Sequence, residues 1–201
     1  VSDKIAELNF NRFKNWEDPT SSENSRHAVY AFKGDVYSGL DADTIEDDKF
    51  DYLQNTLRII SGYYGILRPF DKILPYRLEM GTRLENENGN NLYKFWGDKI
   101  TDVLNADIED GDIVVNLASD EYFKSINKEK LNAEIITPVF KEFKNDSYKV
   151  IAIYAKKARG LMSRFLIERK SKSVDDIKLF NTDGYTFDGN LSTENELVFT
   201  R

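Results

Sequence analysis

One segment carries four residues that could together hold an anionic group. Residues 155–167 read Ala-Lys-Lys-Ala-Arg-Gly-Leu-Met-Ser-Arg-Phe-Leu-Ile, which predicts a helix with a packing face of alanines, Met and Phe. On that helix Lys156, Arg159, Gly160 and Ser163 share a second stripe. A glycine inside a helix costs about 1 kcal/mol relative to alanine, so Gly160 suggests the close approach of a ligand or of another backbone. A solvated basic face explains the charges but not the glycine, and we therefore expect an anion or phosphate site here.

A second candidate is a glycine turn that follows a predicted helix. Gly62 and Gly65 lie three apart and permit a left-handed or exposed backbone, which could point amide N–H groups at a phosphate. The alternative is a glycine that ends the helix and is followed by an ordinary turn. The basic residues nearby that strengthen the phosphate interpretation are Arg68, Lys72, Arg77 and Arg83.

Composition removes several classes of chemistry. The 201 residues include no cysteine, which excludes disulfides, thiolate nucleophiles and sulfur-based zinc sites. The single histidine, His27, lies at the edge of a predicted buried strand, so a structural role is expected and a Ser-His-Asp hydrolase is not. The net charge of −7 argues against coating nucleic acid by bulk electrostatics. Charge is nevertheless segregated, since residues 149–172 hold eight basic side chains and residues 41–51 hold six acidic ones.

The elements that must position these residues follow from hydrophobic spacing. We expect helices over 5–16, 44–60 (with Thr44 as the N-cap and Gly62 at the end), 92–104, 155–167 and 174–180. We expect strands over 27–32, 113–117, 134–137, 150–154 and 197–199. This order predicts an α+β fold, a single compact domain with a mixed central sheet surrounded by helices. The long irregular connection between Pro69 and Asn91 is of the kind that often carries function.

The chain resembles the YaaA peroxide-stress-resistance family over nearly its whole length. The resemblance rests on blocks in a fixed order, namely residues 37–42, 61–69 (Ser-Gly-Tyr-Tyr-Gly-Ile-Leu-Arg-Pro), 75–82 (Pro-Tyr-Arg-Leu-Glu-Met-Gly-Thr), 92–96, 116–123 and 154–160. It implies a cytosolic protein that protects cells from hydrogen peroxide and is associated with lower free intracellular iron. It also implies a positively charged cleft and a helix-hairpin-helix-like element that binds duplex DNA, here the Asp43–Ile60 helix and the Gly62–Arg68 hairpin.

Two features depart from the family pattern. The glycines of the usual hairpin are two apart, whereas here they are three apart and followed by Arg68-Pro69. The resemblance also implies a Ser-Pro-Ala-Lys segment at the start of the family pattern. We expect that segment to be missing from this sequence, which starts at Val1.

The leading prediction is a cytoplasmic stress protein that binds duplex DNA without sequence specificity, with no cofactor, metal site or membrane segment. The predicted DNA- or phosphate-binding residues are Gly62, Gly65, Arg68, Lys72, Arg77, Lys156, Lys157, Arg159, Gly160, Ser163 and Arg164. The alternative is an enzyme that acts on a phosphorylated or otherwise anionic small molecule, with Arg77, Glu79, Asn116 and Ser119 as cleft groups. Direct iron binding is a third interpretation, for which the carboxylate spacing offers no support. Oligomeric state is left open.

Overall fold

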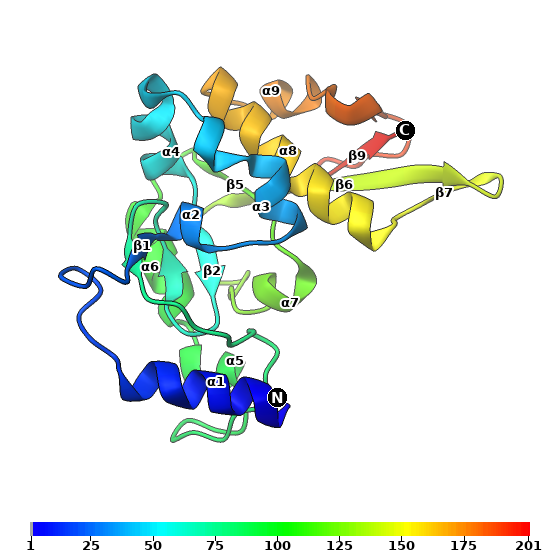
Figure 1. Cartoon of the computed structure of the whole chain (residues 1–201). Helices are drawn as coiled ribbons and strands as arrows, with labels where there is room; N and C mark the ends of the chain where they lie inside the picture. The colour runs from blue at the N-terminus through cyan, green and yellow to red at the C-terminus, as the bar shows by residue number, and fades with distance from the viewer. Residues whose placement is uncertain (1) are drawn as a thin grey trace. The chain divides into compact units, whose positions relative to one another are not determined.

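The computed structural model describes residues 2–201, which form two compact units. The first unit contains the residues up to Ala31 together with Leu57–Ile108 and Ala118–Asn132. The second contains Phe32–Thr56, Glu109–Leu117 and Ala133–Arg201. The chain contains both helices and a sheet with parallel and antiparallel strand pairs, which confirms the predicted α+β class (Figure 1).

A mixed five-stranded sheet organises the second unit. Its order is β5–β6–β9–β8, where β5 is Ile113–Val115, β6 is Glu134–Lys144, β9 is Glu196–Thr200 and β8 is Thr186–Phe187. Strand β6 runs parallel to β5 and to β9, while β8 pairs antiparallel with β9. The far end of β6 pairs antiparallel with β7 (Ser147–Lys149), and this hairpin extends well past the other strands (Figure 1).

The helices of the second unit cover this sheet because their apolar side chains fall on one face. Helix α8 spans Ala152–Arg169, and α9, spanning Val174–Lys178, starts at a capping box formed by Ser173 and Asp176. Residues of α8, α9 and the strands form one core: Ile136, Phe140, Ala155, Ala158, Met162, Ile177, Phe180, Tyr185, Leu197 and Phe199. Helices α3 (Asp35–Leu40) and α4 (Phe50–Thr56) and the 3-10 turns η1 (Ala42–Thr44), η2 (Asp47–Lys49) and η3 (Thr182–Gly184) complete the unit.

The first unit contains two small antiparallel ribbons and several helices. Strand β1 (Arg26–His27) pairs with β4 (Lys72–Ile73), and β2 (Ile59–Ser61) pairs with β3 (Gly65–Leu67). The helices are α1 (Asp3–Lys14), α2 (Ala28–Ala31), α5 (Leu92–Trp96), α6 (Lys99–Asp107) and α7 (Asp120–Phe123). Where α1 ends, Phe13 stacks on Tyr63 of the β2–β3 turn, with ring centroids 5.1 Å apart. An aromatic contact therefore ties α1 to this hairpin.

Three predicted elements are wrong, because short apolar runs suit either a helix or a strand. The helix expected over 44–60 is confined to α4, because Ile59 and Ile60 pair with β3 instead. The strand expected over 27–32 is reduced to two residues of β1, and Ala28 already starts α2. The strand expected over 150–154 is the start of α8, whose Ile153 and Tyr154 are exposed.

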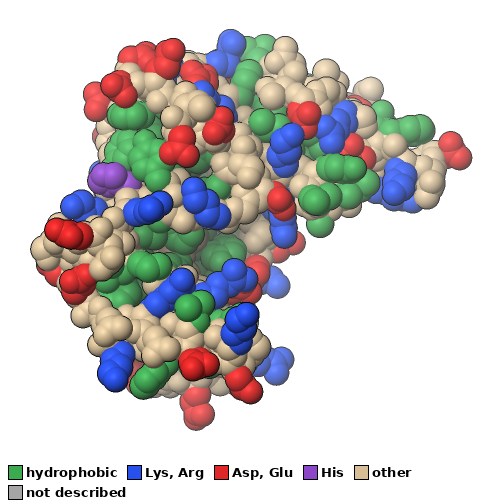
Figure 2. Space-filling view, viewed as in Figure 1, with side chains coloured by type: hydrophobic (Ala, Val, Ile, Leu, Met, Phe, Trp, Pro, Cys, Tyr) green, Lys and Arg blue, Asp and Glu red, His purple; other side chains and the backbone are tan. Residues whose placement is uncertain are grey.

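The remaining elements follow the prediction with shifted bounds. The helix expected over 92–104 is divided into α5 and α6 at Gly97, whose φ is +50°. Thr44 is not an N-cap, because its hydroxyl donates to Asp41 at the end of α3. The acidic side chains of the η1–η2–α4 segment gather on one part of the surface (Figure 2). None of the helices among the described residues has both the length and the apolar character needed to cross a bilayer.

Candidate functional site

The first unit contains an open cleft of about 510 Å³. Its lining residues are Ile5, Arg77, Glu79, Gly81, Thr82, Arg83 and Glu121. Most of them belong to the irregular segment between β4 and α5, which the sequence marked as a functional connection. Glu121 comes from α7 and Ile5 from α1, so segments distant in the sequence meet at one site.

Hydrogen bonds fix the backbone of the cleft. Asn9 of α1 is buried, accepts a hydrogen bond from the Arg77 amide at 2.8 Å and donates to the Arg77 carbonyl. The Gly81 amide donates to the Glu121 carboxylate at 2.8 Å, and the Tyr93 hydroxyl donates to the Glu121 carbonyl at 2.8 Å. A Cβ at Gly81 would lie 2.9 Å from that same carboxylate oxygen, so glycine permits the close approach. The irregular segment is therefore held at both ends of the cleft.

Charge in the cleft is paired but exposed. The Arg77 guanidinium lies 2.7 Å from Glu79, and the two side chains are 59% and 54% exposed. Arg83 is also exposed, whereas one Glu121 oxygen is engaged by Gly81. Next to the cleft, burial raises the pKa of Tyr122, helped by Glu121 and Glu79 and opposed by Arg77. Two guanidinium groups and a threonine hydroxyl can bind a phosphate or carboxylate, while the two carboxylates can accept hydrogen bonds from a ligand.

Residues 1–191 match the family model of the peroxide stress protein YaaA. The chain belongs to this family. The match includes every residue that lines the cleft. The sequence resemblance to YaaA is thereby confirmed, and the family name places this chain in the peroxide stress response.

The glycine hairpin of this YaaA chain does not have the predicted form. Gly62 and Gly65 are buried in the β2–β3 turn, and a Cβ at either would lie within 3 Å of the Leu78 carbonyl or of the Trp96 ring. The Trp96 indole N–H also donates to the Gly62 carbonyl at 3.0 Å. The two glycines thus allow close packing against protein instead of presenting amides to a phosphate. No helix follows the hairpin before α5 among the described residues, so the helix-hairpin-helix expectation is wrong for this segment.

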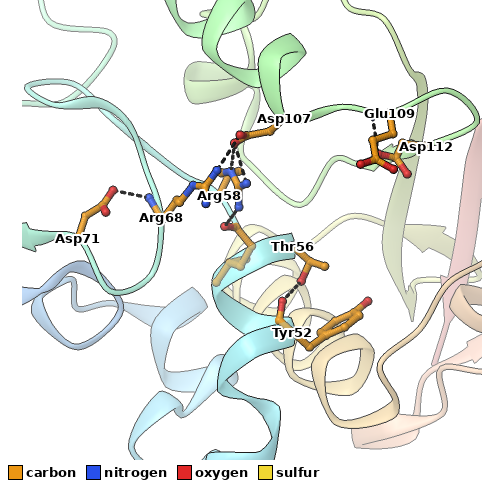
Figure 3. A network of polar contacts seen from close by, with 9 residues as sticks. Tyr52, Thr56, Arg58, Arg68, Asp71, Asp107, Glu109 and Asp112 are labelled. Carbon is orange, nitrogen blue, oxygen red and sulfur yellow. Dashed lines mark hydrogen bonds and ion pairs between the residues drawn. The ribbon is translucent and has the colours of Figure 1, made fainter.

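The basic residues that follow the hairpin are partly engaged. Arg68 and Arg58 share Asp107, with guanidinium-to-carboxylate distances of 2.7 Å each (Figure 3). The hydrogen bond from Arg58 lowers the pKa of Asp107, and the charges of both arginines contribute to the shift. Lys72 is exposed and donates to the Thr20 carbonyl at 3.2 Å. Of the hairpin-side residues expected to bind phosphate, Arg77 is the one that lines the cleft.

The residues predicted on α8 divide into packed and exposed groups. Gly160 is buried against α3, where a Cβ would lie 1.9 Å from the Val36 carbonyl oxygen. Ser163 is buried and its hydroxyl donates to the Arg159 carbonyl. Of the two explanations for Gly160, the approach of another backbone is therefore the one found.

Arg164 holds the end of α3. It donates to the carbonyls of Leu40, Asp41 and Thr44 and forms an ion pair with Glu168 at 2.6 Å. A guanidinium used in this way stabilises the C-terminal end of a helix, where carbonyls lack partners. The structure thus gives Arg164 a structural role, which differs from the predicted phosphate contact.

The basic residues of α8 that face outward are Lys156 and Lys157. Lys156 is exposed, and Lys157 is 52% exposed and 3.8 Å from Asp183. Arg159 is half-buried. These residues belong to the second unit and the cleft belongs to the first, so they form two separate candidate sites.

Two other predicted cleft residues, Asn116 and Ser119, do not line the cleft, and one residue that does was not predicted. Ser119 is the residue preceding α7, and the Asn116 side chain contacts the Thr137 hydroxyl at 3.5 Å in the second unit. Glu79 was predicted and lines the cleft. Glu121 was missed, although it occupies the first turn of a short helix after Ser119, where an acidic side chain is a recognisable signal. Among the described residues no group of three or more His, Cys, Asp or Glu side chains could hold a metal ion.

Proposed function

We propose that this chain is a peroxide-stress protection protein that binds, and acts on, a phosphorylated small molecule in the cleft of its first unit. The observation that carries the proposal is the convergence of Arg77, Arg83 and Thr82 on one cavity of about 510 Å³. That volume lies within the range typical of small-molecule sites. The family assignment supports the peroxide-stress context, and the anionic ligand is inferred from the side chains alone.

The carboxylates in the cleft are compatible with such a ligand. An exposed ion pair such as Arg77–Glu79 contributes only about 0–1 kcal/mol, because water already solvates both charges. A phosphate offers arginine two parallel charge-assisted hydrogen bonds and can displace Glu79 from Arg77. Glu79 and Glu121 would then accept hydrogen bonds from hydroxyl or amino groups elsewhere on the ligand. The arrangement therefore favours a phosphorylated molecule that also carries donors, such as a nucleotide.

Thermal unfolding with added ligand tests the cleft. ADP and inorganic pyrophosphate are expected to raise the melting temperature, since a ligand at 100 times its Kd stabilises the folded state by about 2.7 kcal/mol. Arg83→Ala should abolish the shift, and Glu79→Gln should enlarge it by removing the competing carboxylate. The matched control is Arg26→Ala, which removes another exposed arginine of the same unit outside the cleft. Equal shifts in Arg83→Ala and in the unsubstituted protein would refute the site.

A second candidate function, duplex DNA binding, is supported by a separate observation. Lys156 and Lys157 are exposed on α8, and Lys157 forms a long ion pair with Asp183, at 3.8 Å. Together with Arg159 they could neutralise about three backbone phosphates, which predicts a log-log salt slope of roughly −2.7. This contact would carry no base readout, because lysine contacts to phosphate convey no sequence information.

Duplex binding is tested by fluorescence anisotropy over a salt series. The double variant Lys156→Ala/Lys157→Ala should flatten the slope by about 1.8, one increment of 0.9 for each lost phosphate contact. Lys178→Ala, on α9 of the same unit, is the control and should leave the slope unchanged. If the double variant keeps the original slope, these lysines do not contact DNA.

We further propose that the lower free intracellular iron associated with the family is an indirect effect of ligand or DNA binding, and that this chain does not itself bind the metal. It predicts that cells carrying Arg83→Ala or the double lysine variant lose the fall in chelatable iron together with peroxide resistance. Chelatable iron measured in cells during peroxide challenge checks this. A normal fall in iron with either variant would separate the iron effect from the corresponding site.

A further inference from the structure

The first unit contains a continuous cluster of oxidisable aromatic side chains, none of which lines the cleft. The Trp16 and Tyr63 ring centroids lie 5.0 Å apart, and Tyr63 lies 5.1 Å from Tyr64 and 5.6 Å from Tyr76. Trp16 also reaches Tyr64 at 6.0 Å, and Tyr64 lies 5.5 Å from Tyr76. Phe13 completes the packing against Trp16 and Tyr63. One indole and three phenols thus form a chain in which each ring packs against the next.

The two ends of this cluster lie in different surroundings. Trp16 is half-buried just beyond the end of α1, beside an exposed stretch of chain. At the other end, burial raises the pKa of Tyr76 to about 12, with a smaller contribution from the nearby phenol of Tyr122. Tyr122 in turn interacts electrostatically with Arg77 and Glu79 of the cleft. The cluster therefore runs from a surface indole to phenols that adjoin the cleft.

Two of the phenols have oxygen partners within hydrogen-bond reach. The Tyr76 hydroxyl lies 2.6 Å from the Ser61 hydroxyl. The Tyr64 hydroxyl accepts from the Leu74 amide at 2.9 Å and faces the Leu74 carbonyl. Oxidation of a phenol releases an electron and a proton together, so a nearby oxygen makes the phenol easier to oxidise than a phenol without one.

We propose that Trp16, Tyr63, Tyr64 and Tyr76 form a one-electron relay that takes an oxidising equivalent from the surface indole to the phenols beside the cleft. The oxidant is a one-electron radical in solution, of the class that peroxide yields with reduced metals. It takes one electron from Trp16, is reduced to its anion, and the indole N–H releases its proton to water. A phenol then returns one electron to the indolyl radical, which regains a proton from water, while the phenol proton is released to water, for Tyr76 through the Ser61 hydroxyl, which passes on its own proton.

The relay ends on a phenoxyl radical that a solution reductant can restore. A low-molecular-weight thiol supplies the electron and proton that return the phenol to its original state, and the thiol becomes a thiyl radical. The net result is that one oxidising equivalent leaves the radical in solution and passes to the thiol pool. This activity suits a peroxide-stress protein, and it does not depend on which ligand the cleft binds.

Pulse radiolysis with the azide radical, which oxidises indoles at neutral pH, tests the relay. The indolyl absorption is expected to decay while the phenoxyl absorption grows, in a first-order phase whose rate is independent of protein concentration. Trp16→Phe should lose this phase. Trp96→Phe is the matched control and should retain it, because Trp96 packs on Phe95, Gly65 and the Gly62 carbonyl.

A second pair of variants keeps the test decisive if Trp16→Phe fails to fold. Tyr63→Phe/Tyr64→Phe preserves the rings and their packing but removes the first oxidisable phenols, and it should also lose the first-order phase. Tyr148→Phe, on β7 of the second unit, should not. Retention of the phase in Trp16→Phe or in the double tyrosine variant, or a rate proportional to protein concentration, would show that the cluster serves packing alone.

Discussion

Replacing Gly160 by alanine would place a methyl group where the backbone of α3 already lies. The added Cβ would be 1.9 Å from the Val36 carbonyl oxygen and 2.8 Å from the Leu40 amide nitrogen. Ordinary contact begins at 3.4 Å, so the two helices would have to separate by about 1.5 Å at this point. Because both contacts are to backbone, no side chain can rotate away to relieve them.

The expected magnitude follows from two opposing terms. Overpacking typically costs about 1–3 kcal/mol, and a backbone collision belongs at the upper end of that range. Alanine regains about 1 kcal/mol of helix propensity relative to glycine. The net expectation is a loss of about 2 kcal/mol in the free energy of unfolding. Gly39→Ala should act in the same direction, since its Cβ would lie 2.3 Å from the Lys157 carbonyl oxygen.

Urea unfolding followed by circular dichroism measures the effect. With a slope of about 2 kcal/mol per molar urea, the midpoint should fall by about 1 M. Gly189→Ala is the control, because its Cβ would meet only ordinary contact with Phe187, at 3.5 Å. If Gly160→Ala is as stable as the unsubstituted protein, or about 1 kcal/mol more stable, the contact with α3 is absent and Gly160 is again open to a ligand.

Three further predictions concern the charges and phenols. Arg164→Ala should lower stability by about 1.5–3 kcal/mol in urea, because the guanidinium satisfies carbonyls at the end of α3, while Arg164→Lys recovers only part of the loss. The pKa of Tyr76 is raised to about 12, so its neutral phenol stabilises the fold fully below pH 10.0, and this stabilisation is lost as pH rises towards 12. Tyr76→Phe should reduce this alkaline loss of stability in unfolding curves. The lowered pKa of Asp107 means that its pairing with Arg58 stabilises the fold above the ordinary carboxyl pKa and is lost as pH falls through the lowered value. Asp107→Asn should remove that part of the acid dependence, and an unchanged acid profile would contradict the pairing.

Local spacing was sufficient for the elements whose burial is decided by their own side chains. The sequence predicts helix α8 and the strands β5 and β9 near their observed positions, because Ala155, Ala158 and Met162 recur at helical spacing in α8 and the two strands are short continuous apolar runs. The same reasoning failed at Ile59, Ile60 and Val150. Those apolar residues suit either a helix or a strand: Ile59 and Ile60 pair with β3, whereas Val150 lies between the end of β7 and the start of α8 and belongs to neither.

The candidate site shows the same division. The sequence by itself determined the family, the charged pair Arg77 and Glu79, and the existence of a helix carrying Lys156 and Gly160. Only the tertiary structure decided that Gly160 faces α3 and that Glu121 reaches Gly81, which lies 40 residues earlier in the chain. A residue type records what a side chain can do, but whether a glycine faces a ligand or a neighbouring helix depends on atoms brought together by long-range packing.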